Sequence, residues 1–395
     1  MEAVINEQLS SAIKDIQSKN YDSADKKLIN LLKGNLDDLT RYQGLIHLVE
    51  STCYSGKKEL SKEVFENMLF IPGVVSNPAN KHRLYQNIPY FVSRFQGVGG
   101  DYKIRELAPH FVPTNPSVVF KDDKFVVAVR CVNYTVGEKR VFTPHGDDEK
   151  RFMSKIYMMI MNKNFQLIKP FFLKDNAEII RVASNYLGHE DARLFYHNGE
   201  LYFTSTFLET TTHFHCQIAL SHVNLEKQEI DSTVMLQCQN MNENQKNWLP
   251  FSEDGKLFVV YRLSPFIVNE IDITTGAFKE VSRTNVATWT FPAFRGSAGP
   301  IPWKDGYLLI GHFVDNTHEK YNYYNKFIFM DKKTKKPLRV SESFYLEDHS
   351  VEFITGMVVS EPYLYITYGV NDKEAHAGRY MVDSVDRLTW YKTTY

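Results

Sequence analysis

The segment Leu194–Thr206 reads LFYHNGELYFTST, and its pattern occurs five times between Val118 and Gly369. Each copy has an apolar strand, a polar turn, and a second strand in which apolar and polar residues alternate. The turns contain Asp-Asp, Asn-Gly, Asp-Gly, Asp-Gly and Glu-Pro, and Asn-Gly and Asp-Gly tolerate the positive φ angles of tight hairpin turns. The other copies are VVFKDDKFVVAVR (118–130), PFSEDGKLFVVYR (250–262), GPIPWKDGYLLIGH (299–312) and MVVSEPYLYITYG (357–369).

The copies start roughly 50 to 75 residues apart, close to the repeat period of propellers and other repeat arrays. Five such units predict a mainly β fold, a five-bladed β-propeller, over residues 99–395. If equivalent strands line the central channel, the residues that end the copies meet at its mouth: Arg130, Ser205, Thr206, Arg262, His312 and Tyr368. We therefore expect the functional site at the mouth of the channel.

Residues 1–98 follow a different pattern and predict an α-helical region. Ile5, Leu9, Ile13 and Ile16 recur at helical spacing, and the stretch KNYDSADKKLINLL resembles a helical hairpin of the tetratricopeptide type. We interpret the region as a cap on the propeller or a surface for oligomerisation or a protein partner; a peptide-binding array is the alternative. Further helices are expected over Asp37–Cys53, Lys58–Leu69 and Asn80–Arg94.

The composition argues against several classes of function. The formal net charge is −1, and no basic block favours nucleic acid or an anionic membrane. No apolar run approaches the roughly 18 to 20 residues that span a bilayer, and the polar N-terminal sequence has no signal-peptide core. The four cysteines match no zinc or redox motif, and His213 and His215 have no third ligand nearby in sequence. We expect a cytoplasmic protein without a metal site.

The sharpest local cluster of charged residues is Glu190-Asp191-Ala192-Arg193, which leads into the second copy. On an extended strand Asp191 and Arg193 point to one face and Glu190 to the other. The pair is either a structural ion pair or a catalytic element in which Asp191 protonates a glycosidic oxygen. A general acid needs a raised pKa, and a close Arg193 would lower it. If Asp191 is the acid, Arg193 must hold substrate or point away from the carboxylate.

Other polar residues flank the remaining copies. Lys246 and Arg262 lie at the two ends of the third copy and either flank one anion or form separate surface contacts. Arg295 begins a glycine-rich segment that favours close approach of a ligand to the backbone. Asn115 precedes the first copy, and Arg130 ends it.

In this order the motifs resemble the β-mannoside phosphorylase family, glycoside hydrolase family 130, and related protozoan mannosyltransferase/phosphorylases, over about residues 115–372. The family's Glu-Asp-Pro-Arg corresponds to Glu190–Arg193, and its Lys-Asn…Pro element with a His-Arg strand end is similar to Lys246–Pro250 and Tyr261-Arg262. Its Gly-x-Gly-Pro…His element resembles Gly296 to His312, and its closing motif is similar to Glu352 through Asp372.

The resemblance implies a five-bladed propeller and inverting transfer of a mannosyl-type sugar. It makes Asp191 the proton donor and assigns phosphate to Lys246, Arg262 and the neighbouring Tyr261. Inorganic phosphate, a sugar phosphate or a nucleotide sugar would be the co-substrate, with no other cofactor and a carbohydrate as the partner molecule. The remaining residues expected at the substrate are Asn115, Arg130, Glu190, Arg193, Trp248, Arg295, His312, Glu352 and Asp372, with Tyr134 and Trp248 as sugar platforms.

Two positions depart from the family pattern. Tyr261 replaces a His at the phosphate site, and Ala192 replaces the usual Pro. Phosphorolysis and glycosyl transfer therefore both remain open, and hydrolysis is the third reaction considered. The alternative from another class is a non-catalytic propeller that binds carbohydrate or protein.

Overall fold

The structure is a computed structural model. The described residues are 2–34, 36, 38–55, 57, 110–136, 142–145, 151–178, 186–208, 215–240, 243–286, 294–315, 322–344, 346, 351–386 and 388–395. They divide between two compact units, of which one contains the N-terminal helices and the other most of the β-strands. The helices expected over Lys58–Leu69 and Asn80–Arg94 and the boundary expected at 98/99 lie outside the described residues.

The first unit contains α1 (Glu2–Gln17), α2 (Tyr21–Leu32) and α3 (Asp38–Tyr54). Leu9 and Ile16 are buried on α1, and Leu28 is buried on α2, so the apolar stripe expected from the sequence faces the helical core. Lys57 pairs with Asp25 at 2.7 Å. No helix among the described residues is long and apolar enough to cross a membrane.

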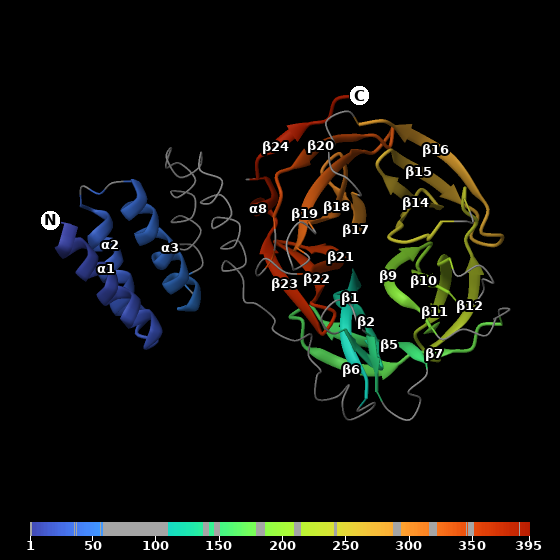
Figure 1. Cartoon of the computed structure of the whole chain (residues 1–395), viewed down its shortest axis with the longest axis horizontal. Coiled ribbons are helices and arrows are strands. Elements are labelled where there is room, and N and C mark those ends of the chain that lie inside the picture. The colour runs from blue at the N-terminus through green and yellow to red at the C-terminus, as the bar shows by residue number, and fades with distance from the viewer. Residues whose placement is uncertain are drawn as a thin grey trace. The chain divides into compact units, whose positions relative to one another are not determined.

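The second unit is a five-bladed β-propeller, which confirms the predicted fold class (Figure 1). Blade 1 contains β1 (Val112–Lys121), β2 (Lys124–Val132), β5 (Phe152–Asn162) and β6 (Leu167–Phe172), with β8 (Tyr186–Leu187) paired to β5. Blade 2 contains β9 (Glu190–His197), β10 (Glu200–Phe207), β11 (Gln217–Asn224) and β12 (Glu229–Met235), with β7 (Lys174–Asp175) at its outer edge. The short strands β3 (Tyr134–Val136) and β4 (Phe142–Pro144) form a separate pair.

The remaining three blades complete the ring. Blade 3 contains β13 (Leu249–Glu253), β14 (Lys256–Leu263), β15 (Phe266–Ile271) and β16 (Phe278–Thr284). Blade 4 contains β17 (Arg295–Trp303), β18 (Gly306–Asp315), β19 (Asn322–Asp331), β20 (Pro337–Ser341) and the later β24 (Trp390–Lys392). Blade 5 contains β21 (Glu352–Ser360), β22 (Tyr363–Val370) and β23 (Glu374–Met381), which the short helix α8 (Asp383–Asp386) follows.

Each sequence copy forms the hairpin between the first two strands of a blade. The turn residues Asn198 and Gly199 have φ of 50° and 90°, and Asp254 has φ of 50°, as tight hairpins require. In the fourth copy Trp303 pairs with Gly306, so the turn is Lys304-Asp305 and not the expected Asp-Gly pair. Lys304 takes the left-handed conformation instead, with φ of 53°.

Neighbouring blades share the hydrophobic core. Four clusters lie between them: Phe125 with Tyr365 across blades 1 and 5, Met158 with Phe203 across blades 1 and 2, Leu220 with Val259 across blades 2 and 3, and Val260 with Leu309 across blades 3 and 4. Because these clusters cover both faces of blades 1, 2 and 3, their second strands are apolar on both sides, as in the VVAV run of β2. This packing fixes the inner strands around the channel.

Candidate active site

The first strands of blades 1 and 2 and the segment that enters blade 3 share a local irregularity at one end of the channel. Asn115, Asp191 and Asn247 have positive φ angles of 45°, 52° and 63°. Asn and Asp adopt this left-handed conformation more readily than other residues with a side chain. The ladders slip next to the first two, between Thr114 and Ser117 and opposite Glu190–Arg193. Such bulges redirect side chains, and here they bring Asn115 into contact with Asp191, while Asn247 contacts Arg193.

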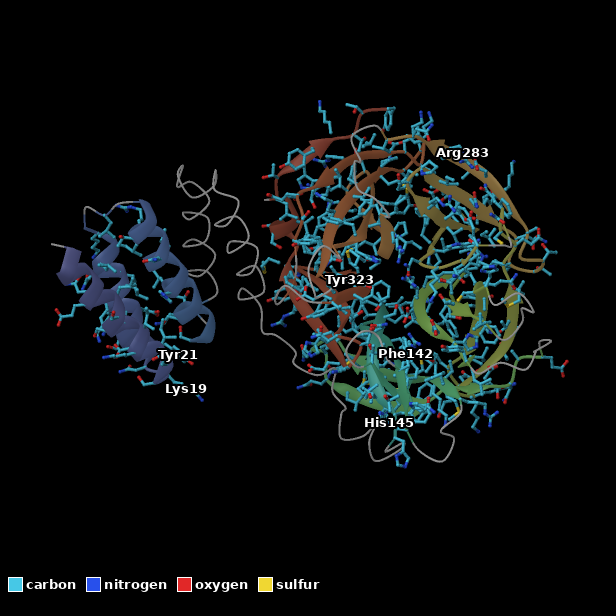
Figure 2. The ribbon with its side chains drawn as sticks, viewed as in Figure 1. Lys19, Tyr21, Phe142, His145, Arg283 and Tyr323 are labelled. Carbon is cyan, nitrogen blue, oxygen red and sulfur yellow. The ribbon has the colours of Figure 1, made fainter. Side chains whose placement is uncertain are left out.

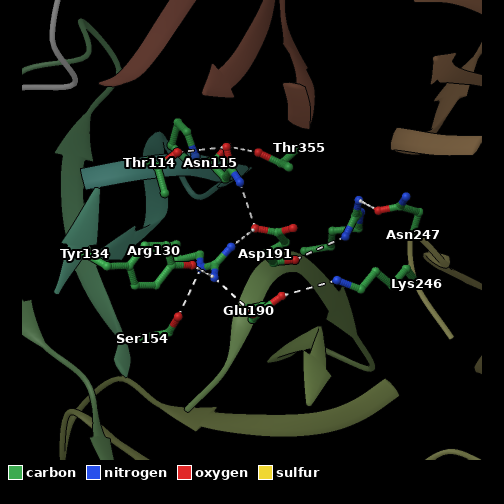
Figure 3. Close-up of polar contacts among 12 residues, drawn as sticks. Thr114, Asn115, Arg130, Tyr134, Ser154, Glu190, Asp191, Lys246, Asn247 and Thr355 are labelled. Atoms are coloured by element: carbon green, nitrogen blue, oxygen red, sulfur yellow. Dashed lines mark hydrogen bonds and ion pairs between the residues drawn. The ribbon is translucent and has the colours of Figure 1, made fainter. Parts of the chain in front are cut away.

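Asp191 lies at the centre of this arrangement (Figure 3). Its Oδ1 accepts hydrogen bonds from Asn115 Nδ2 at 2.8 Å and from the Arg130 guanidinium at 3.0 Å. Arg130 also donates to Ser154 Oγ at 3.0 Å and to the Tyr134 hydroxyl at 2.7 Å. The carboxylate is therefore fixed by blade 1, although it belongs to blade 2.

Glu190 points to the other side of Arg130 and links it to a second cation. Its carboxylate lies 3.1 Å from Arg130 and 3.6 Å from Lys246 Nζ. Lys246 is about half exposed, whereas Arg130 is buried. Of the two cations that contact Glu190, Lys246 is thus the one more accessible to a ligand.

The surroundings of Asp191 favour its ionised form. Burial by itself would raise the pKa of the carboxyl, but the charge of Arg130, the hydrogen bond from Asn115, and the charges of Arg193 and Lys246 outweigh it. The net effect holds the pKa of Asp191 below its usual range. Asp191 therefore lacks the raised pKa that a resting general acid needs. Arg130 lowers this pKa more than Arg193 does.

Arg193 points away from the Asp191 carboxylate and forms hydrogen bonds that connect blade 2 with blade 4 and with the segment entering blade 3. It donates to the backbone oxygens of Ser297 and Asp191 at 3.1 and 3.2 Å, and to Asn247 Oδ1 at 3.1 Å. Its guanidinium also lies 5.6 Å from the ring centre of Phe353. Arg193 is buried, and burial lowers its pKa to about 10. It thus positions the site from beneath, which is the second of the two placements considered for it from the sequence.

His312 lies beside this network on β18. Its Nδ1 is 2.8 Å from Ser297 Oγ, and its ring stacks on Tyr323 with centroids 5.1 Å apart. Burial, together with the charges of Arg295 and Arg193, lowers its pKa to about 3. The imidazole is therefore neutral at physiological pH and offers a ligand hydrogen bonding without charge.

These residues surround a pocket of about 390 Å³, called here the central pocket. The size is typical of a site for a small organic ligand. Figure 2 labels Phe142 and Tyr323, which line it from β4 and from β19 of blade 4. Of the residues predicted from the sequence, the pocket is lined by Asn115, Arg130, Tyr134, Glu190, Asp191, Thr206, Lys246, Arg295, His312 and Asp372.

A second pocket of about 500 Å³, called here the basic pocket, adjoins the first. Lys246, Asn247 and Arg295 line both pockets. Tyr261 and Arg262 line the basic pocket but not the central pocket. Arg262 is partly exposed and pairs with Glu243 at 2.9 Å. The three residues expected to bind phosphate therefore line one pocket, and that pocket adjoins the pocket that contains Asp191.

Two predicted residues have other surroundings. Trp248 is buried and packs edge-on against Tyr261 with ring centres 4.8 Å apart, so its ring belongs to the core and not to an exposed sugar platform. Glu352 is fully buried on β21, and the next residue, Phe353, lines the central pocket instead. The ladder of β21 slips between Ile354 and Gly356, which a sequence pattern does not reveal.

Several pocket residues were not anticipated from the sequence. They are Ser154, Asn247, Ser297, Phe142, Phe152, Tyr186, Tyr323 and Phe353, which contact either the network or the cavity. Asn247 follows Lys246 directly, and its left-handed conformation repeats that of Asp191, so an alignment of the repeats by their polar entry residues would have found it. Among the described residues, no three His, Cys, Asp or Glu side chains are grouped to hold a metal ion.

No protein-family model and no curated protein matches the sequence. Solved structures with a similar chain path include a β-1,2-mannobiose phosphorylase from Listeria innocua, with 13% identity over 72% of this chain and 97% of that one and a TM-score of 0.48. Another comes from work on the GH130 family of mannoside phosphorylases, which is described as containing glycoside hydrolases that target β-1,2 mannosidic linkages in Candida mannan. It has 14% identity over 69% of this chain and 85% of that one, with a TM-score of 0.47.

A third is a mannose phosphorylase from Leishmania mexicana in complex with phosphate ion, with 11% identity, coverages of 71% and 87%, and a TM-score of 0.44. The family that the sequence motifs resemble is thus present among the similar structures. At these identities the likeness concerns the fold alone.

Proposed function

We propose that this chain is a glycan-active enzyme that transfers a mannosyl-type sugar, with inversion, between a carbohydrate and a phosphate-bearing co-substrate. The observation that carries the proposal is the placement of Asp191. It is a mostly buried carboxylate in a pocket that adjoins a second pocket lined by Lys246, Arg262 and Arg295. A proton-transfer group and an anion site side by side are what such a reaction requires.

A phosphate nucleophile is already an anion, so it needs no general base. One carboxylate therefore suffices where ordinary inverting hydrolysis uses two. Lys246 and Arg295 line both pockets, which suits them to hold a phosphoryl group at the boundary between the sugar and the anion. Arg262 and Tyr261 would contact the far side of that anion.

The protonation state of Asp191 favours the synthetic direction in the ligand-free protein. An ionised Asp191 accepts the proton of the acceptor's hydroxyl group. The oxygen of that hydroxyl bonds to the anomeric carbon, and the phosphate-bearing group leaves with the electrons of the bond that breaks. In the reverse direction the same carboxyl, once protonated, returns that proton to the glycosidic oxygen while phosphate attacks. A bound phosphate anion beside Lys246 offsets nearby positive charge and would raise the pKa of Asp191 towards this form.

The test is transfer from mannose 1-phosphate and from GDP-mannose to mono- and disaccharide acceptors, with the Asp191→Asn variant alongside. We expect wild-type turnover and a loss of about a thousandfold in the variant, with sugar binding retained. Asp123→Asn is the matched control, because Asp123 is an exposed turn residue with a similar φ of 56°. Its turnover should equal that of wild type.

The choice of donor separates the two reactions. Product from the sugar phosphate supports a phosphorylase despite Tyr261, and product from the nucleotide sugar alone supports a glycosyltransferase. If wild type turns over neither donor but binds sugars as tightly as Asp191→Asn does, the chain is a carbohydrate-binding propeller and the proposal is wrong.

A further inference from the structure

Four aromatic rings form a continuous surface on one side of the central pocket. Tyr134 lies 5.5 Å from Phe142 and 5.5 Å from Phe152 between ring centres, and Phe152 stacks on Tyr186 at 5.0 Å and 21°. All four line the pocket, and they come from β3, β4, β5 and β8. We call this surface the aromatic wall. Only β5 is one of the four strands of blade 1, and β3, β4 and β8 are additional to them.

The wall runs from the charged centre to the surface. Tyr134 is 8% exposed and its hydroxyl accepts the hydrogen bond from Arg130, which in turn holds Asp191. Phe142 and Tyr186 are 39% and 41% exposed. A ligand that reacts at Asp191 and extends over the wall would therefore leave the pocket across Phe142 and Tyr186.

The wall and the basic pocket belong to different sides of the channel. The wall is built on blade 1, whereas Lys246, Arg262 and Arg295 belong to blades 3 and 4 or the segments entering them. Figure 1 shows blade 1 across the ring from these blades. An inverting displacement brings the attacking and leaving groups to opposite faces of the anomeric carbon. If the phosphate occupies the basic pocket, the other partner in the reaction lies towards the wall.

We propose that the aromatic wall is an acceptor subsite that binds the second sugar ring of an oligosaccharide, and that the acceptor therefore has at least two sugars. The assignment to the acceptor rests on the function proposed above. Phe142 and Tyr186 are partly exposed aromatic rings that line the pocket, and an aromatic ring offers a flat apolar surface for the C–H face of a pyranose. Pockets of this kind use a few polar groups to fix orientation. Here Tyr134, Arg130 and Ser154 supply those groups next to the reacting end.

Binding is measured by calorimetry, without turnover, on the full chain. The probes are mannose, β-1,2-mannobiose, other manno-, gluco- and galacto-disaccharides, and octyl mannoside. Phe142→Ala and Tyr186→Ala remove a ring each, and Phe142→Tyr and Tyr186→Phe retain it. Tyr391→Ala removes a ring that is 50% exposed on β24, outside the residues lining the pocket, and serves as the matched control.

We expect the preference for a disaccharide over its monosaccharide to fall about fivefold in each alanine variant. The ring-retaining variants and Tyr391→Ala should keep the wild-type preference. For active acceptors the same ratio should appear in kcat/KM.

An unchanged preference in both alanine variants would overturn the inference, as would failure of every disaccharide to bind wild type. Tighter binding of octyl mannoside that depends on Phe142, without a gain from a second sugar, would make the wall a site for an apolar aglycone and would also overturn it. If disaccharides bind through the wall but no donor is turned over, the proposed function fails and the wall remains a carbohydrate subsite.

Discussion

Asp191 is mostly buried and yet favours its ionised form. Burial opposes the charge, and the contacts with Arg130 and Asn115 reverse that effect. The backbone of Asp191 is in the left-handed conformation, with φ of 52°, which an Asp residue tolerates. Both features depend on single side chains, so they can be tested by single substitutions.

Replacing Arg130 should change the pH dependence of the reaction. Arg130→Met removes the cation closest to Asp191 and leaves the effect of burial, so the pKa of Asp191 should rise. Since the synthetic direction needs the carboxylate, the acid limb of its kcat/KM profile should move to higher pH by about one unit or more. Arg130→Lys should shift it less, because a cation remains.

The matched control is Arg283→Met, since Arg283 is an exposed arginine paired with Glu280 on the outer strand of blade 3 (Figure 2). Its pH profile should match wild type. An acid limb that stays in place in Arg130→Met would mean that Arg130 does not set the protonation of Asp191. Carbon-13 NMR titration of the Asp191 carboxyl gives the same answer without turnover.

At the scale of the strand, β22 of blade 5 supports Asn115 of blade 1. A side-chain carbon added at Gly369 would lie 2.0 Å from Asn115 Oδ1 and 2.9 Å from its backbone nitrogen, closer than real contacts allow. Asn115 in turn donates to Asp191. The absence of a side chain at Gly369 therefore leaves the space that Asn115 occupies.

We predict that Gly369→Ala displaces Asn115 and lowers kcat by about tenfold, because the hydrogen bond to Asp191 is lost. Asn115→Ala should lower kcat similarly. In the double variant the two losses should not add, since both act on one contact. Fully additive losses would show that Gly369 acts by another route, and circular dichroism of each variant checks that the fold persists.

A second strand-level feature joins blades 3 and 4 at Lys335. Its ammonium pairs with Glu253 of β13, and the two side chains are 9% and 12% exposed. The Tyr307 hydroxyl donates to the same carboxylate at 2.7 Å. The rings of Phe258 and Tyr307 lie 5.3 Å from the ammonium. Burial would raise the pKa of Glu253, but the hydrogen bonds from Lys335 and Tyr307 hold it below its usual range.

Lys335→Met should destabilise the protein by about 3 kcal/mol, because it leaves a mostly buried carboxylate without its cation. The paired change Glu253→Gln with Lys335→Met should recover part of this loss. Since the pKa of Glu253 is lower in the folded protein, its contribution is present above the ordinary carboxyl pKa and is lost as the pH falls through the folded value.

Urea unfolding at neutral and at acidic pH measures both effects. Lys256→Met is the control, because Lys256 pairs with Glu270 at the surface and should cost less than about 1 kcal/mol. Equal losses in the two variants would contradict the importance assigned to the Lys335 pair.

At the scale of the whole propeller, two blades have their outer edge completed by a strand from outside their own stretch of sequence. β7 follows blade 1 in sequence and pairs with β12 of blade 2, while β24 follows blade 5 and pairs with β20 of blade 4. Arg339 of β20 also packs on the Trp390 ring at 5.3 Å. These pairings cover outer edges that would otherwise expose backbone hydrogen-bonding groups.

Removal of residues 388–395 should therefore lower the unfolding temperature by several degrees and promote association through the exposed edge of β20. Thermal unfolding and size-exclusion chromatography measure the two effects. Replacing Tyr391 and Lys392 by Ala is the control, because it retains the backbone pairing. A truncated chain as stable and monomeric as this control would show that β24 does not protect the edge.

The helical spacing of the N-terminal region and the alternation in the five copies were sufficient to predict α1, α2, α3 and the propeller. The exception at Lys304-Asp305 shows the limit of the turn pattern, since the register of the blade placed the turn one residue earlier than the Asp-Gly pair. Part of the site was also predictable, because polar residues that precede or end repeated hairpins must lie near the channel.

The sequence by itself determined the five hairpins, because turn chemistry and strand alternation act between residues close together in the chain. Only the tertiary structure decided which polar groups meet. Asn115 and Asp191 are 76 positions apart, and bulges redirect both into one pocket. The burial of Trp248 and Glu352 and the tie made by Arg193 follow from blade packing. The protonation of Asp191 likewise depends on Arg130 from another blade, since charge interactions act through space and not along the sequence.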